Sequence, residues 1–239
     1  MATLATSRLC AFDTETDGPD PEDARIITAT VLLLGADQPR MDAGWLLKPE
    51  RPIPAEATAV HGIDTATAER DGTDRREAID AIAAALAWSF NEAHPLVAFN
   101  AVYDLTVVDR ECRRVGVPTV VERLGGRSLE PVVDPFVIDK QVDRFRRGRR
   151  TLGVTCSVYG IDLGEAHDST ADALGAARLA YKLAAKFPEI GERDLLDLHK
   201  SQVEWRAEQS ASLEAYFRSQ GKNEAVDPHW PLKPFGGAT

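Results

Sequence analysis

The sequence changes from a strand pattern to a helical pattern near its first third, and this order limits the folds open to it. Apolar runs at 8–15, 25–35 and 42–49 are separated by short links that contain Pro, Gly or Asp. Strands joined by short links pair with one another in antiparallel fashion. At 75–93, apolar residues recur every three or four positions, which is typical of an amphipathic helix. The sequence therefore predicts a three-stranded meander followed by helices.

The middle of the chain alternates between the two patterns. Residues 95–100 form a short apolar run that predicts a buried strand, and 101–116 has helical spacing that ends at a glycine. A further strand is predicted at 129–134. Helices are then predicted at 135–145, 151–161 and 170–187. The predicted order is βββαβαβα, an α/β fold with a mixed central sheet flanked by helices.

Residues 188–239 are predicted to be a C-terminal helical extension. Apolar residues at helical spacing, Leu213 and Tyr216 among them, predict a helix that ends near Gly221 and buries these side chains. The tail beyond it contains several prolines and is not expected to form regular structure. We therefore expect one domain at 1–187, with a C-terminal helix and an irregular tail that pack on it or extend from it.

Composition narrows the class of protein. The three cysteines lie far apart, which favours reduced thiols in the cytoplasm over a disulfide scaffold or a zinc–cysteine site. The most apolar run, 28–36, is too short to cross a bilayer, and the N-terminus lacks an apolar core of signal-peptide length. We therefore expect a cytoplasmic protein with no membrane partner.

The distribution of charge is more informative than its sum. The net charge of −10 does not indicate a nucleic-acid-binding protein. However, five of the seven residues at 144–150 are arginine, and three more arginines lie within 109–114. The guanidinium group matches the geometry of phosphate oxygens, so these segments are candidates for phosphate binding. The alternative is a solvated, charged loop.

The first strand ends in three acids. Asp13, Glu15 and Asp17 are two residues apart, so on a strand their side chains share one face. Like charges at such spacing repel one another unless a cation lies among them. The pattern fits either a solvated strand end or a divalent metal held by carboxylate oxygens.

Two further acids are predicted at helix starts. Asp104 follows the strand that ends at Asn100, and Asp172 follows Ser169 or Thr170, either of which could be a helix N-cap. An acid in a first helical turn also complements the helix dipole, which is a sufficient structural reason for both. His167 lies five residues before Asp172, where a loop could bring it back to the same site.

These residues carry a resemblance to a known family. The segments FDTET (12–16), NAVYDLTVVDRE (100–111) and HDSTADA (167–173) match the three ordered motifs of the DEDDh branch of the DnaQ-like 3′–5′ exonucleases. The resemblance covers about residues 7–187 and is closest to proofreading subunits of bacterial replicative polymerases. It implies a ribonuclease-H-like exonuclease fold, in agreement with the predicted order of elements.

The resemblance also implies a set of site residues. Two divalent metal ions, Mg²⁺ or Mn²⁺, would be held by Asp13, Glu15, Asp104 and Asp172, with Asp104 acting through water. His167 would be the general base, because an imidazole titrates near neutral pH. Asp17 departs from the proofreading pattern, which usually has a neutral residue there, and it adds charge near the metals.

A further segment, EATAVHGI (56–63), resembles the part of proofreading exonucleases that grips the terminal nucleotide. The resemblance implies that Glu56 binds the 3′-hydroxyl, and that Val60 and His61 pack on the terminal sugar and base. The alternative is a transition from loop to helix with a structural histidine. From the first two motifs, Thr14 and Asn100 are expected to contribute to nucleotide binding. Asp134 is expected to support the site without binding metal.

The function that follows is a metal-dependent 3′–5′ exonuclease acting on single-stranded DNA 3′ ends, in proofreading or DNA repair, with a DNA polymerase as a further candidate partner. An exoribonuclease of the same family is one alternative. A non-catalytic nucleic-acid-binding or polymerase-accessory relative is another, although such relatives usually lose an acid or the histidine. A haloacid-dehalogenase-like phosphatase is disfavoured, because it needs Asp where this chain has Glu15.

Overall fold

A single mixed sheet organises the chain in the computed structural model, which describes residues 2–163 and 169–236. The sheet has five strands in the order β3-β2-β1-β4-β5. The first three strands form an antiparallel meander, and β4 and β5 run parallel to β1. The strands are β1 (Leu9–Thr16), β2 (Ile26–Gly35), β3 (Gln38–Leu46), β4 (Leu96–Val97) and β5 (Val132–Val133).

The predicted strands are confirmed in order, but their lengths differ. β3 begins at Gln38, four residues before the predicted start at 42, because Ala36 and Asp37 form a tight turn with positive φ angles of 55° and 54°. Such a two-residue turn matches the twist of the strands that it joins. β3 is exposed along most of its length. Its first residues are therefore polar, and the apolar pattern did not predict them as strand. β4 and β5 have two residues each, shorter than predicted.

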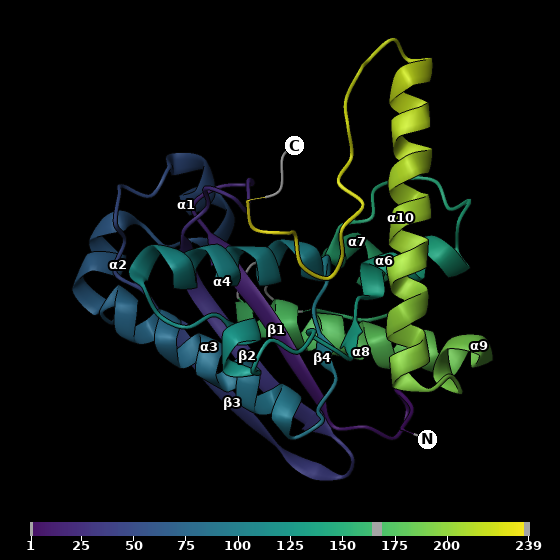
Figure 1. The fold of residues 1–239 in the computed structure, drawn as a ribbon, viewed down its shortest axis with the longest axis horizontal. Coiled ribbons are helices and arrows are strands. Elements are labelled where there is room, and N and C mark those ends of the chain that lie inside the picture. Colours follow the sequence, from purple (N-terminus) through teal and green to yellow (C-terminus); the bar gives the residue numbers. More distant parts are fainter. Residues whose placement is uncertain (1, 164–168, 237–239) are drawn as a thin grey trace.

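Helices cover both faces of the sheet. In Figure 1, α3 and α4 lie in front of the strands and α8 lies behind them. The shorter helices surround this core, and α10 stands along one side. The helices are α1 (Ala55–His61), α2 (Thr65–Asp71), α3 (Arg75–Asn91), α4 (Ala101–Val115), α5 (Val120–Arg123), α6 (Pro135–Val142), α7 (Leu152–Val158), α8 (Ser169–Lys186), α9 (Pro188–Gly191) and α10 (Leu195–Ser219).

The side chains of β1 divide between two apolar cores. Cys10 and Phe12 pack in the cluster formed with α3 and α4, whereas Leu9 and Ala11 pack in the cluster formed with α8. This alternation follows from the two-residue period of a strand. It sets the position of the acids that follow, because Asp13 continues the series that faces α8.

The sequence interpretation did not predict four short helices: α1, α2, α5 and α9. The first two follow a stretch with three prolines, Pro49, Pro52 and Pro54. The prolines all precede α1, and Pro54 is its N-cap, a place where a missing N–H costs no hydrogen bond. Asp64 then caps α2 by accepting a hydrogen bond from the N–H of Thr67. The prolines therefore lie before the helix and do not interrupt it.

α10 covers the edge of the sheet at β5. The Nδ1 atom of His199 accepts a hydrogen bond from the N–H of Val132 (3.1 Å). Gln202 donates to the carbonyl of Val132 (3.0 Å) and accepts from the N–H of Asp134 (2.7 Å). These side chains satisfy backbone groups that an edge strand would otherwise leave unpaired. The extension is therefore part of the packing of the sheet.

The second half of α10 projects past the body of the molecule (Figure 1). Leu213 and Tyr216 are 37% and 58% exposed, so the prediction that they are core residues is wrong. Beyond the helix, the tail returns to α4, where the N–H of Lys233 donates to the hydroxyl of Thr106. No helix or strand is present between 222 and 236, as predicted. The division into domains at residue 187 stays a prediction.

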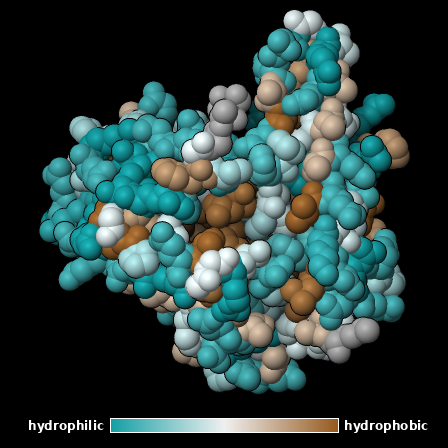
Figure 2. Space-filling model, in the orientation of Figure 1, coloured by the Kyte–Doolittle hydropathy of each residue, from teal (hydrophilic) through white to brown (hydrophobic). Residues whose placement is uncertain are grey.

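The outer surface carries two further observations. Figure 2 shows that hydrophilic residues dominate the drawn face and that hydrophobic residues gather mainly in a hollow near its centre. Across 2–163 and 169–236, every helix is too short or too polar to cross a membrane.

Most of the arginines that we considered for phosphate binding form ion pairs within the fold. Arg110 and Arg113 pair with Asp109, and Arg114 pairs with Glu111. The arginines of the 144–150 segment divide into two groups. Arg146 and Arg150 pair with the buried Asp139, whereas the other three are exposed: Arg144, Arg147 and Arg149.

The contact of α10 with β5 predicts a pH-dependent stability. Burial lowers the pKa of His199 below its ordinary value near 6.5, so the folded protein favours the neutral ring. The stability that this preference contributes is present above the unfolded pKa and is lost as the pH falls below about 6.5. Replacing His199 by Asn keeps a hydrogen-bond acceptor and removes the titration.

We therefore expect His199→Asn to lose less stability than the unsubstituted protein between about pH 7.5 and about pH 5. Urea unfolding at both pH values measures the difference. The comparison cancels the contributions of His61 and His94, whose pKa values burial also lowers. Equal losses in the two proteins would show that His199 does not titrate at this contact.

Candidate active site

Three of the predicted acids meet at the end of β1. Asp13 and Glu15 from β1 and Asp172 from the first turn of α8 each offer a carboxylate oxygen, and these oxygens lie within 4.8 Å of one another. All three side chains are half-buried. The two-residue period of the strand directs Asp13 and Glu15 to the face that α8 covers, and this brings them close to Asp172.

Hydroxyl groups fix the start of α8 beside these acids. The hydroxyl of Ser169, the first residue of α8, lies 2.8 Å from that of Thr30 on β2. Thr30 is paired directly with Asp13 across the antiparallel ladder. The hydrogen bond therefore places the first turn of α8, and Asp172 with it, next to Asp13.

The three carboxylates have the chemistry of a divalent-cation site. Three like charges within 4.8 Å disfavour the ionised state of each group unless positive charge lies close by. Hard divalent cations such as Mg²⁺ and Mn²⁺ prefer carboxylate oxygens as ligands. The donor set, its partial exposure and its place at a strand end fit such an ion.

Asp104 occupies a different position from the other acids. It is buried in α4, and one of its oxygens accepts hydrogen bonds from the N–H (3.1 Å) and the hydroxyl (2.6 Å) of Thr14. Burial raises the pKa of Asp104 to about 7. These bonds tie α4 to β1 at the residue between Asp13 and Glu15. Its expected action through water stays a prediction.

Asp17 does not add free charge to the site. Its carboxylate accepts hydrogen bonds from the N–H of Arg25 (2.7 Å) and from the guanidinium of Arg51. The side chain is almost fully buried in these contacts. The expectation that Asp17 adds charge near the metals is therefore corrected, because Arg51 compensates that charge. The predicted general base, His167, lies outside the described residues.

A cavity of about 580 Å³ opens beside Glu15. Thr14 lines it from β1, and Glu56, Val60 and His61 line it from α1. The four residues therefore lie together, although they come from segments 40 residues apart or more. Tyr103 also lines the cavity, and sequence reasoning missed it. Its place directly before Asp104 in the second motif was the available signal.

His61 presents an unsatisfied nitrogen. Its Nδ1 atom accepts a hydrogen bond from the N–H of Ile63 (3.2 Å), and burial lowers its pKa. A neutral ring with an accepting Nδ1 carries its hydrogen on Nε2. Among the residues that the structure describes, Nε2 is buried and has no hydrogen-bond partner. The ring can therefore donate a hydrogen bond to a ligand.

Asn100 lies apart from this cavity. It is the N-cap of α4, in a left-handed conformation with φ 66°, and its N–H donates to Asp134 (2.9 Å). It lines a second cavity, of about 390 Å³, with residues of α6 and α10. We expected Asn100 to bind the nucleotide together with Glu56 and His61. The structure instead places Asn100 in a different cavity.

Asp134 is a hydrogen-bond acceptor between β5 and α6, and its expected role in supporting the site stays a prediction. Its carboxylate is fully buried and accepts four N–H groups, two on each oxygen. Two of these come from the N-cap and the first residue of α4, one from α6 and one from the indole of Trp230 in the tail. Burial raises the pKa of this carboxyl group. Asp134 thus joins the start of the helix that carries Asp104 to the C-terminal extension. The donors are Asn100 N, Ala101 N, Phe136 N and Trp230 Nε1.

A family comparison identifies the chain. The model of the RNase T family, described as exonuclease, matches residues 10–180, which include Asp13, Glu15, Asp104 and Asp172. The chain belongs to this exonuclease family. The DnaQ-like resemblance and the ribonuclease-H-like fold that it implied are thereby confirmed. No curated protein matches the sequence.

Solved structures of exonuclease I share the fold. The E. coli enzyme in complex with a dT13 oligonucleotide has a TM-score of 0.63 and 16% identity, over 78% of this chain and 43% of that one. The enzyme from Methylocaldum szegediense has a TM-score of 0.62 and 19% identity, over 78% and 42%. A zinc-bound E. coli complex with single-stranded DNA has a TM-score of 0.64 and 17% identity, over 78% and 42%. This exonuclease chain therefore spans less than half the length of these structures.

Asp134 and Asp13 should respond in opposite ways to the same substitution, Asp to Asn. In Asp134→Asn, an amide NH₂ would face two N–H donors, so the free energy of unfolding should fall by about 1–3 kcal/mol. In Asp13→Asn, the loss of one of three crowded charges should leave the metal-free stability unchanged or raise it. Urea unfolding in EDTA measures both. Equal destabilisation would contradict the distinction between a supporting acid and a metal-binding acid.

Proposed function

We propose that this chain is a metal-dependent 3′–5′ exonuclease that removes nucleotides from the 3′ ends of single-stranded DNA. One observation carries the proposal: Asp13, Glu15 and Asp172 gather at the end of β1, and Glu15 also lines a cavity large enough for a nucleotide. Membership of the exonuclease family supports the reaction class.

Asp13, Glu15 and Asp172 would hold the divalent ions. When bound, such ions activate water and neutralise the charge on the attacking and leaving oxygens of a phosphodiester. Asp104 keeps β1 and α4 in register through Thr14, so that Asp13 and Glu15 stay in place on either side of it. The four acids therefore combine ion binding with positioning.

The cavity residues would hold the 3′-terminal nucleotide. Glu56 can accept a hydrogen bond from the 3′-hydroxyl, and Nε2 of His61 can donate to an oxygen of the nucleotide. This bond would satisfy a buried nitrogen that has no partner among the described residues. Val60 is 52% exposed and offers an apolar contact for the sugar or base. A terminal nucleotide bound here would have its phosphate next to Glu15.

The substrate can be tested directly. Digestion of 3′- and 5′-labelled DNA and RNA oligonucleotides, with Mg²⁺, Mn²⁺ or EDTA, should show stepwise loss from the 3′ end of single-stranded DNA with either metal and none in EDTA. Asp13→Asn should abolish this activity. Digestion that persists in EDTA or in Asp13→Asn would contradict the proposal, and digestion of RNA alone would correct the substrate.

His167 is the proposed general base, on the resemblance of its motif. The variant His167→Ala should retain metal and substrate binding and lose about a hundredfold or more in turnover, the usual share of a general base. Turnover of the unsubstituted protein should fall on the acid side as the imidazole protonates, and this limb should weaken in the variant. Turnover against pH, with metal affinity by calorimetry, decides the point. Near-normal turnover would make His167 structural.

The cellular setting is part of the proposal. The three cysteines are free and buried, which supports a reducing compartment such as the cytoplasm. The resemblance to proofreading subunits supports a role in proofreading or DNA repair, with a DNA polymerase as partner. The exonuclease I complexes are named as bound to single-stranded oligonucleotides, which supports single-stranded DNA as the substrate.

A further inference from the structure

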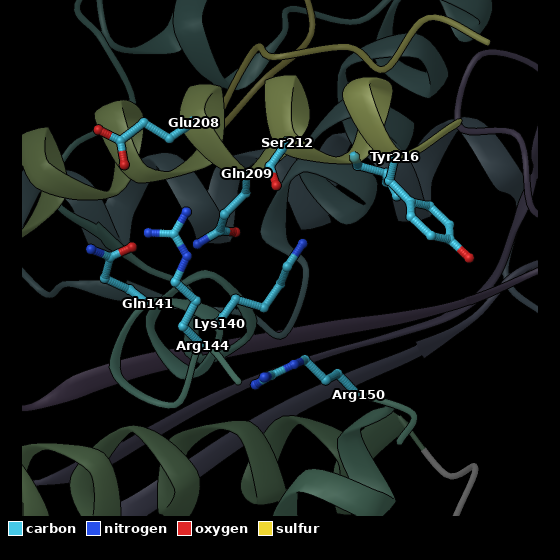
Figure 3. A pocket seen from close by; sticks show the side chains of 9 residues that line it. Lys140, Gln141, Arg144, Arg150, Glu208, Gln209, Ser212 and Tyr216 are labelled. Atoms are coloured by element: carbon cyan, nitrogen blue, oxygen red, sulfur yellow. The ribbon is translucent and has the colours of Figure 1, made fainter. Parts of the chain in front are cut away.

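A groove runs between α6 and α10, outside the carboxylate site. It consists of two cavities, of about 240 and 390 Å³, and Lys140, Arg150 and Gln209 line both. Figure 3 shows Lys140 and Arg144 reaching toward α10, from which Gln209 and Ser212 project. We call these two cavities the α6–α10 groove. Its walls come from an element of the family domain and from the C-terminal extension.

The groove concentrates cations that the fold does not pair. Lys140, Arg144 and Arg206 line it, and none of them forms an ion pair with another described residue. This contrasts with Arg110, Arg113 and Arg114, whose charges are all compensated by neighbouring acids. In the described part of the chain, one acid lines the groove, the exposed Glu208. The groove therefore has a positive excess in a protein of net charge −10.

A buried donor in the groove also lacks a partner. Among the described residues, Nε of Arg206 is buried without a hydrogen bond. Burial, together with the nearby charges of Arg206 and Arg150, lowers the pKa of Lys140. An anion in the groove would offset this repulsion and would give Arg206 an acceptor.

One end of the groove lies near the edge of the sheet at which β1 and β4 end. Asn100, the N-cap of α4, lines the larger cavity together with Phe99. α4 carries Asp104, and β4 runs parallel to β1, so the ends of both strands lie at the same edge of the sheet. At the groove, Leu213 and Tyr216 of α10 expose apolar surface, which can stack against bases.

We propose that the α6–α10 groove binds the backbone phosphates of the single strand on the 5′ side of the scissile bond. The proposal rests on the proposed exonuclease function and adds the path of the substrate to it. Phosphates match the unpaired cations, and single-stranded bases match the exposed apolar side chains. The C-terminal extension thereby becomes part of the substrate-binding surface. This also gives the exposed second half of α10 a role.

Affinity for strands of two lengths tests the proposal. We would measure binding of 5′-fluorescein-labelled dT12 and dT3 by anisotropy, with Ca²⁺ in place of Mg²⁺ to prevent cleavage. The groove variant is Lys140→Gln with Arg206→Gln. Its matched control is Lys182→Gln with Lys200→Gln, which removes two exposed cations from α8 and α10 outside the groove.

The groove variant should bind dT12 about tenfold more weakly, and the slope of log K against log salt should shrink by about 1.4, because each lost phosphate contact removes about 0.7. The trinucleotide should lose much less affinity, because it is too short to fill the groove from the carboxylate site. The control should keep the affinity and slope of the unsubstituted protein. An unchanged slope in the groove variant, or equal losses for both lengths, would overturn the proposal.

A substitution of opposite sign completes the test. Glu208→Gln removes the acid that lines the groove, so it should tighten dT12 binding by a few-fold and leave dT3 nearly unaffected. Weaker or unchanged binding would count against the groove. Digestion of dT12 by the unsubstituted protein is scored separately. If digestion fails, the proposed function fails; if digestion succeeds while the groove variant binds dT12 normally, only the path of the strand is wrong.

Discussion

The mutual repulsion of three carboxylates at the end of β1 is the constraint on which the rest of the structure depends. Asp13, Glu15 and Asp172 are held within 4.8 Å of one another by elements that cannot easily separate. β1 lies at the centre of the sheet, and the Thr30–Ser169 hydrogen bond fixes the start of α8 against it. The fold thus holds together three negative charges that favour a bound divalent cation.

Outside the carboxylate site, hydrogen bonds and ion pairs satisfy some of the acids and arginines and leave other cations available to a ligand. Asp134 is satisfied by four N–H donors, and Asp139 by Arg146 and Arg150. Lys140, Arg144 and Arg206 form no ion pair with another described residue, and they line the α6–α10 groove. In the proposed function, a strand of nucleic acid would supply phosphates for these cations and a scissile bond next to Asp13, Glu15 and Asp172, the proposed metal ligands. The extension then serves two purposes, because the first half of α10 seals β5 and the second half forms the groove.

The sequence predicted those parts of the structure that depend on local periodicity. The meander, α3, α4 and α8 follow from apolar spacing, and Asp13 and Glu15 share a face because a strand repeats every two residues. The parts that it could not predict depend on partners distant in the chain. Arg51 neutralises Asp17 from 34 residues away, and Trp230 reaches Asp134 across 96. Asn100 matched the second motif, yet the turn at the start of α4 places it in a different cavity from His61.

The location of bound metal tests the central claim most directly. Crystals soaked in Mn²⁺ and measured near the manganese absorption edge would show each ion by its anomalous scattering. The account predicts density among Asp13, Glu15 and Asp172, with two ions about 3.5–4 Å apart when a substrate strand is present. Mn²⁺ bound at other acids, with none among these three, would contradict it.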